Sequence, residues 1–427
     1  MLRCLWRWEL RPTTGRIGIR PHLLEAPIEL PSPRFWSCSP PRRPPRARQM
    51  TGQGAARHYL QVLERAQKEF VNWAGRGVSV LEMGYRTDNF REVMADAEEK
   101  FRRLQEIPDD FEVHFLNGGA TLQFAAVPMN LLGKPGRWNT SHYKTANYVR
   151  SGHWSEKARD EARMYCHVHE VCKDPQDLYF GMPDPKDWEF EQNAVYCHFT
   201  AADTRQGFEF QQFPFEVVPK GQWVVCDASA NLGSKPWDWE KYDVVYAAAH
   251  KNFSTSGVCY TMIRKNLITE DVLPGTPTMC NWNRFQTAPD KVWTVPVTFS
   301  VWLGKLTCEW MLERGGLPAF EDLAIRRSSL LYDTIDNSNG FYNTFVTDPL
   351  YRSRMQVVFT IRDGMGKNEA LVSKFLEETD AMGWLDVRSH PLGIPSDAIR
   401  ITMYNPQPME AIEVVREFLH DFQRRHE

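Results

Sequence analysis

The chain has 427 residues, a length that predicts roughly two or three domains and a large hydrophobic core. Its 51 basic and 54 acidic residues give a formal charge of -3, which argues against a nucleic-acid groove or a polybasic membrane surface. The nine cysteines are scattered without a C-x-x-C pair, and no stretch approaches the ~20 apolar residues of a membrane span. We therefore expect small-molecule partners, with no nucleic acid and no membrane among them.

The first 49 residues differ in composition from the rest of the chain. They contain ten arginines, no lysine and three acidic residues, and they include the run SPPRRPPRAR. A segment of this composition cannot build a core, so residues 1–50 are predicted to be a disordered leader rich in Arg and Pro. Met50 could be the true start. A cytoplasmic location is expected, with mitochondrial or plastid import through residues 1–49 as the alternative.

Residues 51–316 alternate between strand-like and helix-like segments, beginning with a helix. This first helix is predicted over residues 57–73, where apolar residues recur at helical spacing, at Leu60, Leu63, Ala66, Phe70 and Trp73. Further helices are predicted over residues 89–105, 122–132 and 301–316. Short apolar runs predict strands at residues 111–116, 194–199, 222–227, 243–249 and 258–263. This alternation predicts a large α/β domain with a mostly parallel sheet.

Residues 317–427 show a different pattern, typical of a smaller α+β domain. It consists of a helix from about residue 317, a strand at 355–361, a helix at 368–383, a strand at 399–403 and a helix at 408–425. We therefore expect two folded domains after the leader, divided near residue 316.

A lysine and an aspartate each follow a predicted strand of the large domain. Lys251 comes after the apolar run VVYAAA, and Asp227 ends the run WVVCD. Ligands of open α/β sheets collect at the carboxyl ends of strands, so the two side chains could face one crevice. A lysine amine there can form a Schiff base, and an aspartate can hold the proton on a pyridine nitrogen, as pyridoxal phosphate requires. A structural salt bridge would give the same pattern.

The turn NGGAT, residues 117–121, joins a predicted strand to a predicted helix. Two glycines at this place let backbone N–H groups and the helix N-terminus point at an anion such as a phosphate. The turn fits neither G-x-G-x-x-G nor G-x-x-x-x-G-K, so the nucleotide-binding motifs are excluded. A cofactor with a phosphate group remains compatible with it, as does a simple turn.

Taken together with these features, several segments of residues 57–427 resemble the phosphoserine aminotransferases, a family of class V, fold-type I pyridoxal phosphate enzymes. The segments are, in chain order, GVSVLEM, NGGATLQFAAVPMNLL, YVRSGHWSEKARDEA, CDASANLGSKPWDWEKYDVVYAAAHKN, IDNSNGFY and IRITMYN. The resemblance implies a fold-type I transferase fold with a large mostly parallel-sheet domain and a smaller C-terminal α+β domain. It also implies a homodimer.

The resemblance assigns residues to the cofactor. Lys251 would bind it covalently and move the substrate proton, Asp227 would pair with the pyridine nitrogen, and Trp154 would stack on the ring. The remaining cofactor positions, which include one from the neighbouring subunit, match Ala120, Thr121, Thr204, His250 and Thr294.

The resemblance also assigns residues to the substrates, L-glutamate and a phosphorylated oxo acid, which carry two anionic ends each. Arg400 matches the arginine that binds the α-carboxylate, while Arg86 and His390 match positions at the distal phosphate or carboxylate. Arginine forks suit such anions.

Several positions depart from the family pattern. The family's N-terminal N-F-x-x-G-P-A-x-L-P segment is absent, Tyr85 replaces a histidine, and Pro391 replaces an arginine. The Asn-Thr pair that reaches the neighbouring cofactor phosphate appears as Thr294-Val295. These changes bear on phosphate affinity and substrate choice more than on the fold.

The segment CHVHEVC, residues 166–172, is the strongest candidate for a metal site. As a strand it would send His167 and His169 to one face and Cys166 and Cys172 to the other, which separates the potential zinc ligands. We therefore predict structural positions in a strand and no metal site.

Three functions are compatible with the sequence. We expect an aminotransferase that moves an amino group from glutamate to 3-phosphohydroxypyruvate and gives O-phosphoserine for serine synthesis. The alternatives are an aminotransferase with a changed, unphosphorylated oxo-acid substrate, and a catalytically silent relative that keeps the fold. Intact Lys251, Asp227, Trp154 and Thr204 argue against the silent relative.

Overall fold

The structure is a computed structural model, and it describes residues 60–134, 144–172, 181–362, 368–384, 387 and 398–427. The predicted leader of residues 1–50 lies outside the described residues, as do His390 and Pro391. All described residues belong to one unit, Arg46–Glu427. Within it, none of the described helices is long and apolar enough to cross a membrane.

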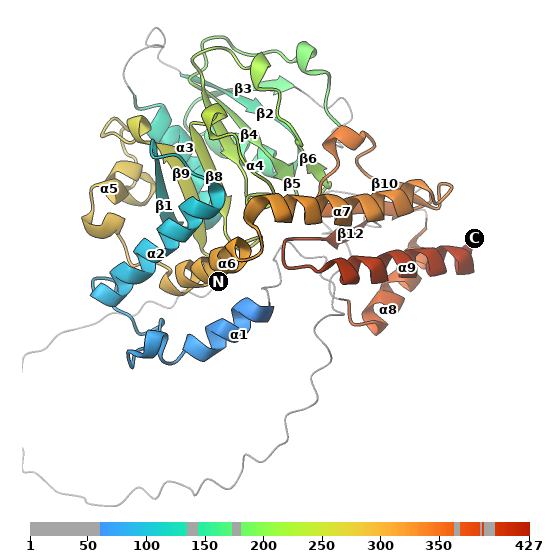
Figure 1. The fold of residues 1–427 in the computed structure, drawn as a ribbon. Helices are drawn as coiled ribbons and strands as arrows, with labels where there is room; N and C mark the ends of the chain where they lie inside the picture. Colours follow the sequence, from blue (N-terminus) through green and yellow to red (C-terminus); the bar gives the residue numbers. More distant parts are fainter. Residues whose placement is uncertain (1–59, 135–143, 173–180, 363–367, 385–386, 388–397) are drawn as a thin grey trace, which may run out of the picture. The chain divides into compact units, whose positions relative to one another are not determined.

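A seven-stranded sheet forms the centre of the larger part of this unit (Figure 1). Its spatial order is β1 (Phe111–Asn117), β9 (Val258–Arg264), β8 (Val244–Ala248), β7 (Trp223–Asp227), β4 (Tyr196–Thr200), β2 (Thr145–Val149) and β3 (His167–Cys172). Strand β9 is antiparallel to both of its neighbours, and the other pairs are parallel. Six strands therefore share one direction, so their carboxyl ends meet at one edge of the sheet.

The prediction of an α/β domain with a mostly parallel sheet is confirmed. Strands β1, β4, β7, β8 and β9 agree with the predicted strands within about two residues, which is the usual uncertainty of an element boundary. Strand β2 was missed because its sequence, TANYV, contains no apolar run. Its Asn147 is buried between neighbouring segments, and the side chain is satisfied by Gln222 Oε1 at 2.8 Å and the Glu191 carbonyl at 3.0 Å.

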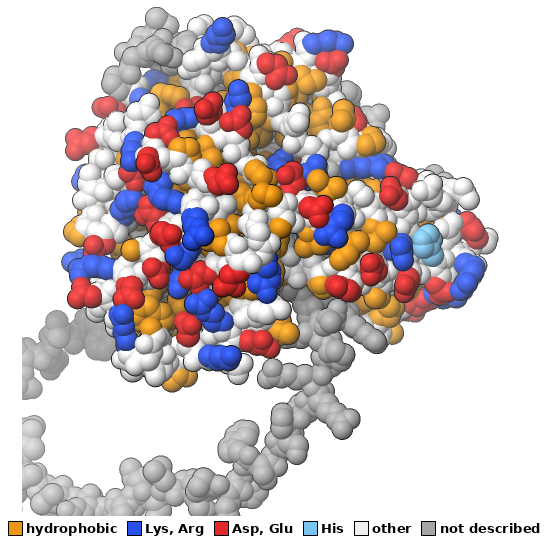
Figure 2. Space-filling model, in the orientation of Figure 1, with side chains coloured by type: hydrophobic (Ala, Val, Ile, Leu, Met, Phe, Trp, Pro, Cys, Tyr) orange, Lys and Arg blue, Asp and Glu red, His pale blue; other side chains and the backbone are white. Residues whose placement is uncertain are grey.

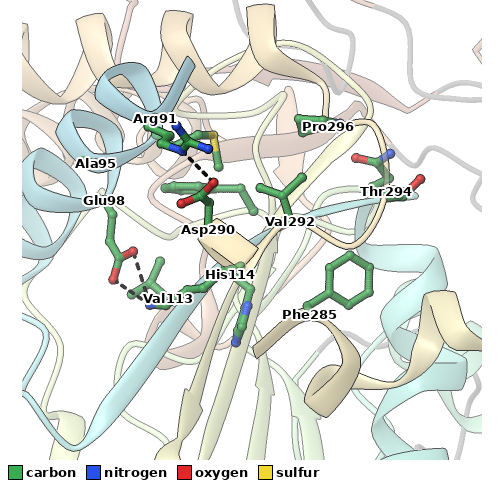
Figure 3. Close-up of a pocket in the computed structure, with 14 residues that line it drawn as sticks. Arg91, Ala95, Glu98, Val113, His114, Phe285, Asp290, Val292, Thr294 and Pro296 are labelled. Atoms are coloured by element: carbon green, nitrogen blue, oxygen red, sulfur yellow. Dashed lines mark hydrogen bonds and ion pairs between the residues drawn. The ribbon is translucent and has the colours of Figure 1, made fainter. Parts of the chain in front are cut away.

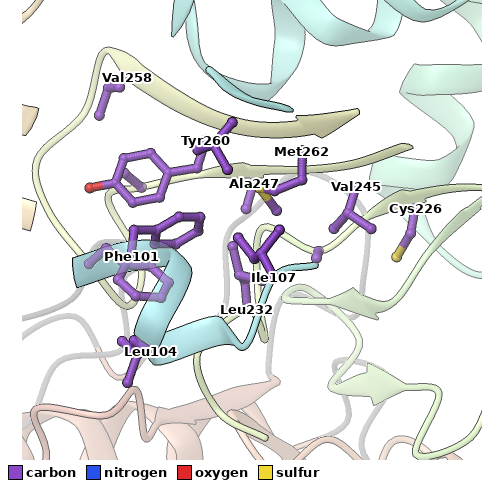
Figure 4. Packing of buried hydrophobic residues seen from close by; sticks show 14 of the residues in the cluster. Phe101, Leu104, Ile107, Cys226, Leu232, Val245, Ala247, Val258, Tyr260 and Met262 are labelled. Carbon is purple, nitrogen blue, oxygen red and sulfur yellow. The ribbon is translucent and has the colours of Figure 1, made fainter. Parts of the chain in front are cut away.

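Helices pack on both faces of this sheet. One face is covered by α2 (Asp88–Gln105) and α6 (Thr298–Leu312), and Figure 4 shows Phe101 of α2 beside Tyr260 of β9. The rings of Phe101 and Tyr260 meet edge to face, with centroids 4.7 Å apart. The opposite face is covered by α3 (Gly119–Leu131), α4 (His153–Ala162) and α5 (Trp282–Gln286). Because neighbouring strand residues such as Val245 and Tyr246 pack in different clusters, the sheet is buried on both sides.

The first helix differs from its prediction in length and in its buried face. Helix α1 spans Leu60–Glu69, and its buried residues are Val62 and Ala66. Phe70 lies beyond the helix and is exposed, and Trp73 is buried in a short 3₁₀ turn, Trp73–Gly75. Val62 and Ala66 are four residues apart and form the stripe of the helix that is buried. Of the predicted apolar residues, Ala66 and Trp73 are buried, whereas Leu60 and Phe70 are exposed, so the prediction of one continuous apolar stripe was wrong.

The C-terminal part contains α7 (Gly316–Asp336), a three-stranded antiparallel sheet and two further helices, α8 (Glu369–Ala381) and α9 (Met409–His426). The sheet order is β10 (Tyr342–Thr344), β11 (Gln356–Ile361) and β12 (Ile399–Thr402). Apolar residues of α7, β11, α8 and α9 share one hydrophobic cluster. The division into domains at residue 316 stays a prediction.

A small two-stranded sheet, β5 (Ala202–Asp203) and β6 (Phe208–Glu209), follows β4 in the chain. Arg400 of β12 donates to the carbonyl of Thr204, in the turn between β5 and β6, at 2.9 Å. The C-terminal sheet thereby contacts the segment at the carboxyl end of the central sheet. On the face drawn in Figure 2, acidic and basic side chains are interspersed.

Candidate active site

A cavity of about 420 Å³ lies at the carboxyl ends of strands β4, β7 and β8. The structure brings six of the residues predicted from the sequence together in its wall, namely Ala120, Thr121, Trp154, Asp227, His250 and Lys251. The parallel directions of these strands explain the arrangement, because loops that follow parallel strands converge at the same sheet edge.

Lys251 follows β8 and is buried, with 6% of its surface exposed. Its Nζ lies 5.8 Å from the centroid of the Trp154 ring. Burial lowers the pKa of Lys251 and the charge of Arg400 lowers it further, while the carboxylates of Asp227 and Asp203 oppose this shift. A lowered pKa increases the fraction of free amine, which is the nucleophilic form of lysine.

The loop that carries Lys251 is held on both sides. Asn252 donates to the carbonyl of Leu232 at 3.0 Å and accepts from the backbone N–H of Asn405 at 3.1 Å. His250, the preceding residue, also lines the cavity, and burial together with the charge of Lys251 lowers its pKa to about 4. His250 is therefore neutral near pH 7.

Asp227 ends β7 and has 3% of its surface exposed. Its Oδ1 accepts from the backbone N–H of Ser229 at 2.9 Å and from the Ser229 hydroxyl at 2.6 Å. Burial raises the pKa of Asp227, and the hydrogen bonds from Ser229 and the charge of Lys251 oppose that rise. The site thus places a buried carboxylate and a buried amine in one cavity.

Trp154 is positioned from two sides by the segment that follows β4. Its backbone N–H donates to Asp203 Oδ2 at 2.9 Å, and its indole N–H donates to the Thr204 hydroxyl at 3.2 Å. Asp203 is fully buried, and Gly152 packs so closely on it that a Cβ there would lie 2.6 Å from the carboxylate. The Thr204 carbonyl accepts from Arg400 at 2.9 Å. Thr204 is thus hydrogen-bonded to Trp154 of the cavity wall, and Arg400 is hydrogen-bonded to Thr204.

The N-terminus of α3 forms another part of the cavity wall. Gly118 and Gly119 have φ values of 96° and 61°, which glycine adopts without the steric cost that other residues meet. The Gly118 N–H donates to the Gly257 carbonyl at 3.0 Å, which fixes the turn, and no side chain caps the helix. An uncapped helix N-terminus that lines a cavity can bind a phosphate through its backbone N–H groups.

These features fit pyridoxal phosphate, which is a flat ring with a basic nitrogen, a carbonyl and a phosphate. The cavity offers an amine, a carboxylate, an indole and a helix N-terminus. It also contains the buried Thr200 hydroxyl, which has no hydrogen-bond partner among the described residues. A polar ligand would satisfy this group.

Thr204 and Arg400 do not line this cavity themselves, and two further predicted residues among those described, Thr294 and Arg86, do not line it either. Thr294 lines a different cavity of about 310 Å³ beside α2 and β1 (Figure 3). Arg86 is exposed, and its guanidinium lies 5.3 Å from the ring centroid of Tyr85. His390 lies outside the described residues.

The predicted strand at CHVHEVC is present as β3, and no cluster of His, Cys, Asp or Glu among the described residues is arranged to hold a metal ion.

Reasoning from the sequence missed Asp203, Ser229 and Thr200. Asp203 stands next to Thr204 and Ser229 stands two residues after Asp227, so proximity to predicted residues was the available signal. It was too weak to separate these residues from the other polar residues of the same loops.

The chain belongs to the class-V aminotransferase family, whose match covers residues 50–383. It is therefore a pyridoxal phosphate-dependent aminotransferase. Among curated relatives, the phosphoserine aminotransferase of Marinomonas sp. (strain MWYL1) is 37% identical over 86% of this chain and 95% of the relative. That of Geobacillus kaustophilus (strain HTA426) is 35% identical, with the same shares of the two chains covered.

Solved structures give the same result. Phosphoserine aminotransferase from Bacillus circulans subsp. alkalophilus superposes with a TM-score of 0.81 and 31% identity over 90% of this chain and 99% of the other. The pyridoxal phosphate-bound phosphoserine aminotransferase from Trichomonas vaginalis has a TM-score of 0.79 and 30% identity, over 88% of this chain and 100% of the other. The predicted family, fold and cofactor are confirmed.

Proposed function

We propose that the chain transfers an amino group from L-glutamate to 3-phosphohydroxypyruvate and so forms O-phospho-L-serine in L-serine synthesis. The observation that carries this proposal is its similarity to enzymes named phosphoserine aminotransferase over 95% of their length. The cavity around Lys251 and Asp227 supports it, because both groups that this chemistry needs are buried in one place.

Pyridoxal phosphate, when bound, supplies an electron sink for charge that develops at the substrate Cα. Lys251 Nζ is the amine that would hold the cofactor, and it would accept and return the proton at the substrate Cα. Asp227 would hold the proton on the pyridine nitrogen, and Trp154 would stack on the ring. Further contacts to the cofactor are assigned to Ala120, Thr121, Thr204 and His250.

Arg400 is the proposed partner of the substrate α-carboxylate. It is buried, and its bond to the Thr204 carbonyl ties it to the segment that holds Trp154. Its positive charge also contributes to the lowered pKa of Lys251. Arg86 and His390 are the proposed partners of the distal phosphate or carboxylate.

A homodimer is part of the proposal, with Thr294 reaching the cofactor phosphate of the neighbouring subunit. The segment around Thr294 is connected to the turn at the α3 N-terminus, because Asn117 Nδ2 donates to the Val295 carbonyl at 2.9 Å. The cytoplasmic location, with import through residues 1–49 as the alternative, stays a prediction.

An aminotransferase with a changed substrate is the second candidate. The observation that favours it concerns the residues expected at the distal end of the substrate. Arg86 is exposed there, and its neighbour is the neutral Tyr85 in place of the family's histidine. Fewer cations near a dianionic phosphate weaken its binding.

Steady-state kinetics with protein that starts near Met50 separate these functions. With glutamate as donor, the proposal predicts the highest kcat/KM for 3-phosphohydroxypyruvate. A higher kcat/KM for an unphosphorylated oxo acid would support the changed substrate, and no turnover with any acceptor would support a silent relative.

A further inference from the structure

The Ser229 hydroxyl connects the two strands that carry Asp227 and Lys251. It lies 2.6 Å from Asp227 Oδ1, and it accepts from the backbone N–H of Ala248 at 3.0 Å. Ala248 is the last residue of β8, three residues before Lys251. Ser229 is 8% exposed and lines the same cavity as the amine and the carboxylate.

These contacts fix the direction of the hydroxyl proton. A backbone N–H can only donate, so the Ser229 oxygen is the acceptor in its bond with Ala248. Its own proton is then free to donate to Asp227 Oδ1, which also accepts from the Ser229 backbone N–H. Two donors therefore hold Oδ1 as an acceptor, and among the described residues none donates to Oδ2.

Among the described residues, Lys251 is the charged group that acts on the pKa of Asp227, and four other titratable groups near it are neutral. Lys251, from the loop after β8, lowers the pKa of Asp227. Tyr246 of β8 and Cys226 of β7 are kept neutral because burial raises their pKa values well above normal, and the pKa of Cys259 of β9 is raised to about 12. Burial keeps His250 neutral as well, with a pKa of about 4.

We infer that Ser229 is a positioning residue that keeps Asp227 ionised and leaves Oδ2 to receive the proton of the cofactor's ring nitrogen. The inference rests on the proposed role of Asp227. A hydroxyl that donates to the carboxylate stabilises its charged form, and the bond to Ala248 prevents the hydroxyl from turning away.

The test is the dissociation constant of pyridoxal 5'-phosphate, measured by equilibrium dialysis against the full chain over a range of pH. Ser229→Ala should weaken binding roughly ten-fold near pH 7, the scale of one lost hydrogen bond to a charged group. Without that bond the pKa of Asp227 is higher, so as pH falls the loss of affinity should begin at a higher pH than in the parent.

Ser234→Ala is the matched control. Ser234 lies in the same loop, is 3% exposed, and donates its hydroxyl to the Asn231 carbonyl at 2.6 Å and not to Asp227. This variant should leave the affinity and its pH dependence as in the parent. A shift as large as that of Ser229→Ala would overturn the inference, because it would show a general effect of disturbing the loop.

Asp227→Asn supplies the second test, because an amide at this position has no charge to stabilise. Adding Ser229→Ala to Asp227→Asn should change the dissociation constant by less than about three-fold. An equal ten-fold loss in both backgrounds would show a structural role for Ser229 alone. If Asp227→Asn itself bound the cofactor like the parent at every pH, the proposed role of Asp227 would fail, and the inference with it.

Discussion

Gly152→Ala should disrupt the support of Trp154 without touching the cavity directly. The new Cβ would lie 2.6 Å from Cγ and Oδ2 of Asp203, closer than real Cβ atoms approach other atoms. Asp203 cannot move without cost, because it is fully buried and its two oxygens accept from the backbone N–H groups of Trp154 and Arg205 at 2.9 and 2.8 Å.

The expected magnitude follows from these contacts. Overpacking in a rigid interior costs about 1–3 kcal/mol, and weakening hydrogen bonds to a buried carboxylate adds about 1.5–3 kcal/mol. Gly152→Ala should therefore lower the free energy of unfolding by about 2.5–6 kcal/mol. Because Trp154 loses the carboxylate that holds its backbone, affinity for pyridoxal phosphate should fall too.

Urea unfolding followed by tryptophan fluorescence gives the measurement, with Gly340→Ala as the matched control. Gly340 also has a positive φ, of 79°, but no atom lies within 4 Å of its Cβ position. Alanine there should cost only the backbone strain, about 1–2 kcal/mol. If both variants lost the same stability and Gly152→Ala bound the cofactor normally, the close contact with Asp203 would have no role in holding Trp154.

Other predictions concern turnover, substrate affinity and assembly. Lys251→Ala should fold but lose at least about 10²–10⁴-fold in turnover, the scale of a positioned acid–base group; near-normal turnover would reject the assignment. Arg400→Gln should raise KM for the oxo acid about ten-fold to a thousand-fold, because a buried anion loses its charge partner, and an unchanged KM would place the carboxylate elsewhere. Arg86→Ala should impair 3-phosphohydroxypyruvate more than hydroxypyruvate, and equal losses would show that Arg86 does not read the phosphate. Light scattering should give the mass of a dimer, whereas monomer alone at working concentration would contradict the proposed assembly.

The parts of the fold that the sequence predicted are those with a strong local pattern. Helix α2 and strands β7 and β8 have the periodicity or the apolar run of their element, and their bounds differ little from the prediction. Strand β2 has neither. The side chain of its buried Asn147 is hydrogen-bonded to residues 44 and 75 positions away in the chain. Such a pairing depends on tertiary structure, and local sequence contains no sign of it.

The sequence predicted those site residues that have a reactive side chain and stand at or just after the end of a predicted strand. Lys251 and Asp227 are such residues, and the topology places both in one cavity. Asp203 was not predictable, because its importance comes from the approach of Gly152 and the backbone of Trp154, which are about 50 residues away in the chain. Arg86 fits a sequence pattern and is exposed in the single chain, so its role at the distal end of the substrate stays a prediction.

The proposed function requires that the cavity at the carboxyl ends of β4, β7 and β8 binds pyridoxal phosphate through Lys251. Borohydride reduction of the yellow, cofactor-loaded protein, followed by peptide mass spectrometry, tests it most directly. We expect the visible absorption band to disappear and the pyridoxyl mass to be found on the peptide that contains Lys251. Protein that stays colourless after addition of the cofactor, or an adduct on another lysine such as Lys235, would contradict it.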